Sequence, residues 1–336
     1  MLQFRSGSIR LAAVAVTLAL SLSLNAKLQA MEVVVTAVTA LPTKHDLSQT
    51  FLELFVKRVN DEGKGIVRVD YKGGPEVIPQ KKSAQAVQRG AIDMLHSPAA
   101  YHAGITPQSA ALMATNMTPK EVRANGGFDH IRGIWDKKLN TQIISWSEAA
   151  AQFYLYMVRE PTYRADGTVD LTGYKVRSTG AYRALLEALG ASPISMPVSD
   201  VYTALERGVV DGFGWPSVGL KALGLANAVK FRIDPPFYHL ANLVLLNNDK
   251  WGTLPQAAKD ILLKVGEEYE LSSSKRMMEK GAEDEAAILE AGVKIIKLSG
   301  KAEKDYLDAA YGSAWKRIAK RLDANEVSLL KSKLLK

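Results

Sequence analysis

The feature that most constrains the fold is a long proline-free run that follows Pro255 and continues to about Ala291. Only Gly266 and Gly281 interrupt it, and single glycines weaken a helix without ending it. At 1.5 Å per residue, a helix of some 37 residues reaches roughly 55 Å, which exceeds the width of a domain of about 150 residues. We therefore predict a long C-terminal helix that braces two lobes.

Upstream of this run, strands and helices alternate. The β-branched segment Glu32–Val38 predicts a buried strand, apolar residues at helical spacing over 51–59 predict a helix, and Ile66–Tyr71 predicts the next strand. This β-α-β order predicts a parallel sheet. Further elements are expected in the same alternation: a helix at Lys81–Arg89 and strands at Ala91–Leu95, Gln142–Trp146 and Phe153–Val158.

From Asp170 onward the pattern repeats in two short units. Tyr174–Ser178 predicts a strand, followed by a helix that Gly190 ends; Ser199 is the expected N-cap of a second helix, which Gly208 ends before a strand at Val209–Gly212. Arg177 and Trp215 are expected in loops at the ends of these strands. Ligands of open α/β sheets bind at the carboxyl ends of strands, so both side chains should face one cleft.

The first 30 residues have the composition of a secretory signal. They contain three basic residues and no acid, and the apolar stretch Leu11–Leu24 precedes a small-residue site ending at Ala30. That stretch is shorter than the roughly 20 residues needed to cross a bilayer. We expect cleavage near Ala30, a location outside the cytoplasm, and a core that folds without disulfides because the chain has no cysteine.

The net charge of +8 does not indicate nucleic-acid binding, because of where the charges lie. The signal segment carries three of them, and residues 301–336 hold nine basic and five acidic residues. About one positive charge is left for the 270 residues between, so no basic stripe covers the main body. The C-terminal basic residues fit a solvated helix face.

Four sequence motifs follow one another in the second half of the chain: DLTGYKVR at 170–177, LGA at 189–191, MP at 196–197 and DVYTALERGVVDG at 200–212. In order and spacing they resemble the solute-binding proteins of tripartite ATP-independent periplasmic (TRAP) transporters, the DctP-like family. Weaker matches are GGPE at 73–76, AVQRGAIDM at 86–94 and WGTLP at 251–255. The likeness therefore covers most of the chain beyond the signal segment.

The resemblance implies an α/β periplasmic receptor whose two hinged lobes, each a mixed or mostly parallel sheet flanked by helices, close over an organic acid. It would deliver this carboxylate to the small and large membrane subunits of a TRAP transporter. We expect residues 31–153 and 243–283 in the first lobe and residues 154–242 and 284–336 in the second. We also expect a monomer with no catalytic activity, no cofactor and no nucleic-acid partner.

Arg177 matches the arginine that grips the ligand carboxylate in such receptors. Guanidinium is planar, permanently charged and forked, which suits two parallel hydrogen bonds to a carboxylate. Trp215 stands where relatives vary the side chain that sorts ligands, and an aromatic wall suits the flat body of an acid. Without the resemblance, two other roles are open: Arg177 could pair with a carboxylate of its own lobe, and Trp215 could be a core residue buried between a helix and the sheet.

The resemblance offers two further candidates upstream of Arg177, Arg159 and Gln152. Arg159 stands about where many relatives carry a second arginine, and ligand contact and a surface ion pair are equally compatible with its position. Gln152 lies near the position of a metal ligand in relatives that bind acids through sodium or calcium. Those relatives carry a carboxylate where this chain has Gly214, so we expect binding without a metal.

The remaining candidates come from connections between elements. Tyr101 and His102 follow a predicted strand and could supply a ligand contact from the first lobe, although loop residues of this kind are usually solvated. Phe237, Tyr238 and Asn242 lie in the return connection between the lobes, where they could seal the cleft or pack the hinge.

Two other functions remain open from the sequence. The same receptor could dock on a chemoreceptor or on the ectodomain of a histidine kinase and act as a sensor. A periplasmic enzyme on this fold is the second alternative, but the sequence has no G-x-S-x-G motif, and its five histidines show no zinc-binding spacing.

Overall fold

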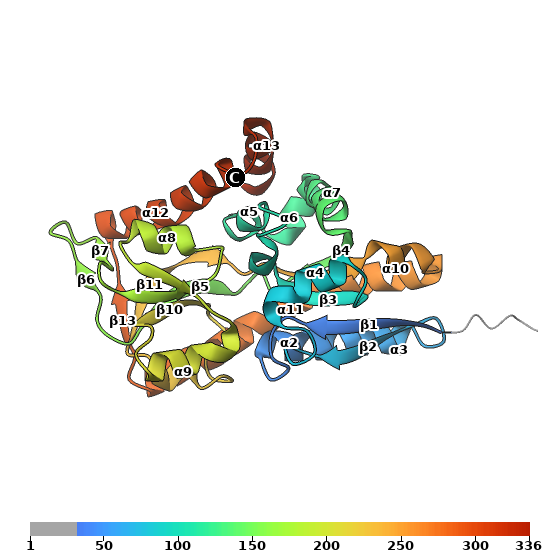
Figure 1. Cartoon of the computed structure of the whole chain (residues 1–336), viewed down its shortest axis with the longest axis horizontal. Coiled ribbons are helices and arrows are strands. Elements are labelled where there is room, and N and C mark those ends of the chain that lie inside the picture. Colours follow the sequence, from blue (N-terminus) through green and yellow to red (C-terminus); the bar gives the residue numbers. More distant parts are fainter. Residues whose placement is uncertain (1–31) are drawn as a thin grey trace, which may run out of the picture.

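The computed structural model describes residues 32–336 and places them in two lobes that lie side by side, each built on one sheet (Figure 1). The predicted signal segment, residues 1–30, lies outside the described residues. Within the described chain, no helix combines the length and the apolar character that a membrane span requires. The expected two-lobed α/β architecture with a long C-terminal helix is confirmed.

The first lobe contains a five-stranded mixed sheet with helices on both faces. Its strands, in spatial order, are β2 (Val67–Gly73), β1 (Val33–Thr39), β3 (Met94–Pro98), β12 (Asn242–Asn247) and β4 (Thr141–Ser147). β1 is parallel to β2 and β3, whereas β12 is antiparallel to β3 and β4. Because helices cover both faces, the strands are mostly apolar without strict alternation, as the sequence VVVTAVT of β1 illustrates.

The second lobe contains a six-stranded mixed sheet. Its strands, in spatial order, are β13 (Lys294–Lys297), β11 (Phe231–His239), β5 (Gln152–Met157), β10 (Gly212–Pro216), β8 (Lys175–Ser178) and β9 (Ser192–Ser195). The neighbours β10, β8 and β9 run parallel, and β5 is antiparallel to β10 and β11. A small ribbon of β6 (Thr162–Tyr163) and β7 (Val169–Asp170) stands apart from this sheet.

Short helices flank both sheets. In the first lobe these are α2 (Asp46–Phe51), the π-helix η1 (Leu52–Val56), α3 (Lys57–Glu62), α4 (Ser83–Gln88), α5 (Ser109–Met113), α6 (Pro119–Ala124), α7 (Gly127–Leu139) and α10 (Asn248–Thr253). The second lobe has α8 (Arg183–Ala188) and α9 (Val201–Glu206). In α6, Thr118 and Glu121 form a reciprocal capping box, and Pro119 stands in the first turn.

The predicted long helix is α11 (Gln256–Glu290), 35 residues without a break. Its first half packs on the first sheet, where Tyr269 joins the core. A Cβ at Gly266 would lie 2.4 Å from the carbonyl oxygen of Ile144, so the glycine permits close packing on β4. Near its end, Asp284 accepts hydrogen bonds from the backbone N–H groups of Gly219 (2.7 Å) and Lys221 (2.6 Å) in the second lobe. The helix therefore braces both lobes.

The C-terminal helices are divided between the lobes (Figure 1). α12 (Gly300–Ala319) lies on the second lobe, where the carbonyl of Ala310 accepts a 2.6 Å hydrogen bond from the Tyr238 hydroxyl. α13 (Ala324–Leu334) packs against α5 and α7 of the first lobe, and the Thr115 hydroxyl donates to the carbonyl of Leu334 at 2.6 Å. Residues 324–334 thus sit with the first lobe, although the sequence placed all of 284–336 in the second.

Two predicted strands begin about three residues too early, at Ala91 and Val209. The structure starts β3 at Met94 and β10 at Gly212. The cause is a Schellman motif at the end of each preceding helix, in which the N–H groups of Ala91 and Val209 bond back to the carbonyls of Ala86 (3.0 Å) and Ala204 (2.9 Å). These residues complete helix ends, so the strands start later.

The predicted N-cap at Ser199 is also wrong. A 3-10 turn, Val198–Asp200, leads directly into α9, and the hydroxyl of Ser199 bonds the carboxylate of Asp200 at 2.8 Å. The turn extends the helical hydrogen-bond pattern toward Pro197, so no side chain is needed as a cap.

Candidate functional site

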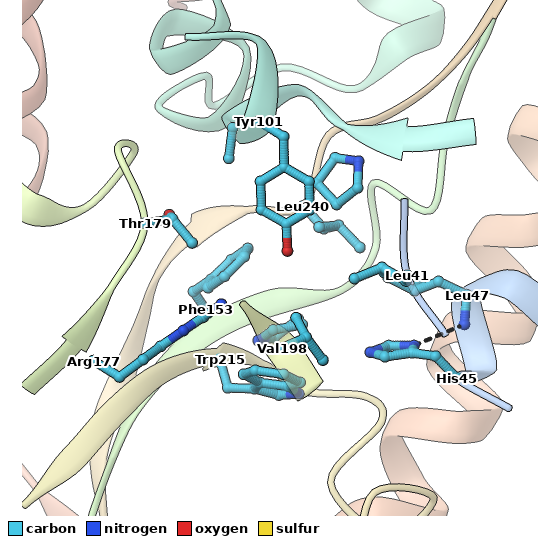
Figure 2. Close-up of a pocket in the computed structure, with 13 residues that line it drawn as sticks. Leu41, His45, Leu47, Tyr101, Phe153, Arg177, Thr179, Val198, Trp215 and Leu240 are labelled. Carbon is cyan, nitrogen blue, oxygen red and sulfur yellow. Dashed lines mark hydrogen bonds between the residues drawn. The ribbon is translucent and has the colours of Figure 1, made fainter. Parts of the chain in front are cut away.

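A small cavity of about 30 Å³ lies between the lobes, at the carboxyl ends of β1, β3, β8 and β10 (Figure 2). Both lobes contribute to a mostly apolar lining: Leu41, His45, Leu47, Pro98, Ala100 and Tyr101 from the first lobe, and Phe153, Arg177, Thr179, Val198, Trp215 and Pro216 from the second, with Leu240 from the connection between them. In this lining Arg177 is the charged side chain, and no carboxylate accompanies it.

Arg177 is 2% exposed, yet it forms no ion pair with any residue in the described part of the chain. It is the third residue of β8 and points into the space between the lobes (Figure 2). One guanidinium nitrogen donates to the hydroxyl of Tyr182 at 3.0 Å, and another approaches the carbonyl of Met196 at 3.4 Å. Its Nε is buried without a partner among residues 32–336. The cation is therefore held in place by neutral groups, with hydrogen-bonding capacity left over.

Tyr182 and Gly214 together fix the position of Arg177. The Tyr182 hydroxyl donates to the carbonyl of Gly214 at 2.7 Å, so its oxygen lone pairs are available to accept from Arg177. A Cβ at position 214 would lie 2.5 Å from Cε2 of the Tyr182 ring. The space that a carboxylate side chain at position 214 would need is therefore filled by Tyr182.

Trp215 forms one wall of the cavity. It is the fourth residue of β10, beside the parallel strand that carries Arg177, rather than in a loop as expected. Its indole N–H donates to the carbonyl of Val218 at 3.1 Å, which leaves the ring face as its contribution to the site. The guanidinium carbon of Arg177 lies 5.2 Å from the ring centroid, within the range of cation–π attraction.

Tyr101 and His45 face Arg177 from the first lobe. The hydroxyl of Tyr101 points into the cavity (Figure 2), and burial raises the pKa of this phenol although the nearby Arg177 opposes the shift. His45 caps α2, where its Nδ1 accepts from the backbone N–H of Leu47 at 3.2 Å. The sequence analysis missed His45. The signal that could have found it is its position in a loop after β1, at the same sheet edge as Tyr101.

The structure does not bring Arg159 or Gln152 into the cavity lining. The Arg159 side chain is 51% exposed; it pairs with the carboxylate of Asp211 at 3.0 Å and stacks on Tyr174. Of the two positions that the sequence left open for Arg159, the structure has the surface ion pair. Gln152 begins β5, and its carbonyl accepts from the N–H of Ser217 at 2.8 Å.

The other candidates lie in the core or the hinge and not in the lining. Phe237 is fully buried among aromatic rings, with Tyr238 at 5.1 Å and Tyr306 at 6.3 Å between centroids. Asn242 begins β12, and its side-chain amide lies 3.1 Å from the imidazole Nε2 of His96. His102 is buried against Trp135 and within 3.1 Å of the Ser97 hydroxyl.

We predict that the Gly214→Ala substitution weakens ligand binding several-fold, because the new methyl group displaces the Tyr182 ring that positions Arg177. Overpacking of this kind also lowers the free energy of unfolding by about 1–3 kcal/mol. The matched variant is Tyr182→Phe, which removes the oxygen acceptor of Arg177 without adding volume. Calorimetric titration of both variants checks the prediction, and unchanged affinity in both would contradict it.

We predict that acidification from pH 7 to pH 5 destabilises the protein, in part through His102. Burial lowers the pKa of His102 from 6.5 to about 3, so the folded protein keeps this imidazole neutral while the unfolded chain protonates it. Proton uptake by the unfolded state alone then costs about 2 kcal/mol of stability at pH 5. Urea denaturation at both pH values should show a smaller loss in His102→Gln than in the control His130→Gln, at a partly exposed histidine of α7; equal losses would contradict this.

Comparisons with known proteins place the chain. Residues 38–322 match the family described as bacterial extracellular solute-binding protein, family 7. The chain is 24% identical over 338 residues to the C4-dicarboxylate-binding periplasmic protein DctP of Rhodobacter capsulatus, with 95% of each chain covered. It is 25% identical over 263 residues to a monocarboxylate 2-oxoacid-binding periplasmic protein of Nostoc, with 74% of this chain and 69% of that one covered.

The fold also matches a solved structure. A TRAP periplasmic solute-binding protein from Desulfovibrio salexigens, with bound orotic acid, superposes with a TM-score of 0.79 at 19% identity, covering 90% of this chain and 99% of that one. At this identity the likeness speaks for the fold, and the family match spans most of the chain. The chain thus belongs to the bacterial extracellular solute-binding proteins of family 7, the DctP family of TRAP receptors.

Proposed function

We propose that this protein is a periplasmic receptor that captures a small monocarboxylate between its lobes and delivers it to the membrane subunits of a TRAP transporter. The observation that carries the proposal is Arg177, a buried cation with no carboxylate partner in the described chain and with an unpaired Nε–H. A buried guanidinium in an apolar lining is strongly stabilised by an anion that enters beside it. A ligand carboxylate fits that requirement.

The lining supports a ligand with one negative charge. Arg177 is the single cation among the residues around the cavity, and Arg159 is held outside by Asp211. The second carboxylate of a dicarboxylate would be desolvated without a charged partner, which is costly in an apolar site. The likeness to the monocarboxylate 2-oxoacid-binding relative is consistent with this reading.

Binding without catalysis is part of the proposal. His45 would be the general base of such a cavity, but its Nδ1 accepts a hydrogen bond from Leu47, which places the proton on Nε2. In that tautomer the nitrogen that faces the cavity is a donor and not a base. We also propose that ligand binding needs no metal, because Tyr182 fills the space beside Gly214 where a carboxylate ligand of the metal would lie. Residues 1–30 would be a cleaved secretory signal. The receptor would be a monomer.

A thermal-shift screen of organic acids on the purified mature protein tests this function. A compound that binds the folded state raises its melting temperature, and micromolar affinity corresponds to about −8 kcal/mol. We expect monocarboxylates to raise the melting temperature in buffer with and without a chelator, and neutral sugars to leave it unchanged. Responses to sugars or amines but not to acids would contradict the proposal.

A further inference from the structure

Three neighbours hold the imidazole of His45 in one orientation at the cavity. The backbone N–H of Leu47 bonds its Nδ1 at 3.2 Å, and its ring lies 6.1 Å from that of Trp215. Gly219 closes over the other edge: a Cβ there would lie 2.7 Å from Cε1 and 2.8 Å from Nε2 of His45. Gly219 has φ +93°, a conformation that L side chains rarely adopt, so both backbone and space favour glycine.

In this orientation Nε2 is the ring nitrogen without a hydrogen-bond partner among the described residues, and Gly219 packs beside it. Among the described residues the imidazole makes one hydrogen bond, at Nδ1, and Figure 2 shows the other ring nitrogen on the side of Val198 and Trp215, which line the cavity with His45. The residue is 1% exposed, and burial lowers its pKa to about 4. The ring is therefore neutral at pH 7 and presents an N–H group to the cavity, opposite the guanidinium on the second lobe.

We infer that His45 is a second ligand-binding residue, which donates from Nε2–H to an uncharged oxygen of the ligand while Arg177 holds the carboxylate. The ligand class is then a monocarboxylate that carries a carbonyl or hydroxyl oxygen on an otherwise apolar body. This inference rests on the proposed function and adds the feature that distinguishes one acid from another.

The chemistry of the two groups favours this pairing over other ligands. The N–H of neutral His45 can donate to a carbonyl or hydroxyl oxygen, whereas a second carboxylate buried there would have no cation to neutralise it. The walls between the two groups are apolar, with Leu41, Phe153 and Val198 among them. A sugar acid with many hydroxyl groups would leave several of them without partners against these walls. An acid whose only oxygen atoms are those of its carboxylate, held by Arg177, would leave the His45 N–H without a hydrogen-bond partner in the closed site.

The experiment compares three acids of equal length: pentanoate, 2-oxopentanoate and 4-oxopentanoate. Two substitutions separate the two ring nitrogens of His45. His45→Asn keeps an acceptor for the N–H of Leu47 and so keeps the helix cap, but its amide is too short to replace Nε2. His45→Gln places an N–H donor near the original Nε2 position and loses the cap. His130→Asn, a histidine of α7 outside the lining, is the control.

We expect the wild-type protein to bind at least one oxo acid more tightly than pentanoate, by about ten-fold, as for a buried donor that gains its partner. His45→Asn should lose this preference and keep its affinity for pentanoate, while His45→Gln should retain part of the preference. The control should match the wild type. Melting temperatures of the unliganded variants show whether each one folds.

Three results would overturn the inference: equal affinities of the wild type for all three acids, a preference that survives in His45→Asn, or equal weakening of all three acids in that variant. If none of the three acids binds but the wider screen finds another acid, the role of His45 fails while the proposed function stands. If no acid binds at all, both fail.

Discussion

Replacing Arg177 with alanine should weaken ligand binding by at least 2–3 kcal/mol, roughly a hundred-fold in Kd, while leaving the fold intact. The ligand carboxylate would be desolvated in a cavity whose lining offers no other cation. The guanidinium has no carboxylate partner in the described chain, so its removal breaks no internal ion pair. Calorimetric titration of the best ligand from the acid screen measures the loss, and the unliganded melting temperature should stay the same or rise.

Two variants sharpen this prediction. Arg177→Lys keeps the charge but loses the planar fork, so it should also bind poorly. Arg159→Ala removes an arginine of equal charge that is exposed and paired with Asp211, and its affinity should stay within about two-fold of the wild type, as for most surface ion pairs. Wild-type affinity in Arg177→Ala, or equal losses in the Arg177 and Arg159 variants, would refute the carboxylate assignment.

Replacing Glu148 with alanine should lower the free energy of unfolding by about 3–5 kcal/mol, as expected when one member of a buried polar network is removed. Glu148 is fully buried at the crossing from β4 to β5. Its carboxylate accepts from the Ser147 hydroxyl at 2.8 Å and from the Tyr269 hydroxyl, and it lies 3.3 Å from Nε2 of His96. Without it, these groups are buried without their partner.

The charge on Glu148 gives this prediction a pH dependence. Burial raises the pKa of the carboxyl, but His96 and the hydrogen bonds of Tyr269 and Ser147 outweigh it, and the net pKa lies below the ordinary value of 4.5. The contribution to stability is thus present above pH 4.5 and is lost as the pH falls through the folded pKa. Urea denaturation checks the loss, with the exposed Glu279→Ala as control. A loss below 1 kcal/mol would contradict the network.

The parts of the fold that local sequence determines were predictable. The run that forms α11 has no proline and only two glycines, and the β-branched residues of β1 favour a strand. Strand starts were less predictable, because the backbone hydrogen bonds that end α4 and α9 extend past their glycines. The division of the C-terminal helices could not be inferred either, since α13 depends on long-range contacts such as that between Thr115 and Leu334.

The site was predictable where a strand end set the position. Arg177 and Trp215 stand on neighbouring parallel strands, so the sheet itself brings them to one cavity. His45 was missed because nothing in the local sequence distinguishes a helix cap from a ligand contact, and its neighbours Trp215 and Gly219 belong to the other lobe. Arg159 could not be placed from the sequence because its partner, Asp211, is 52 residues away.

The unpaired guanidinium also bears on which form of the receptor a transporter meets. Closing the lobes over a bare cation removes its hydration without supplying an anion, and such a charge carries an effective penalty of several kcal/mol. A ligand anion beside Arg177 therefore lowers the free energy of the shut conformation relative to the open one. If the transporter binds a surface that forms only in the shut conformation, it binds liganded receptor in preference to unliganded receptor. Unliganded receptor, however abundant, would then compete poorly for the transporter.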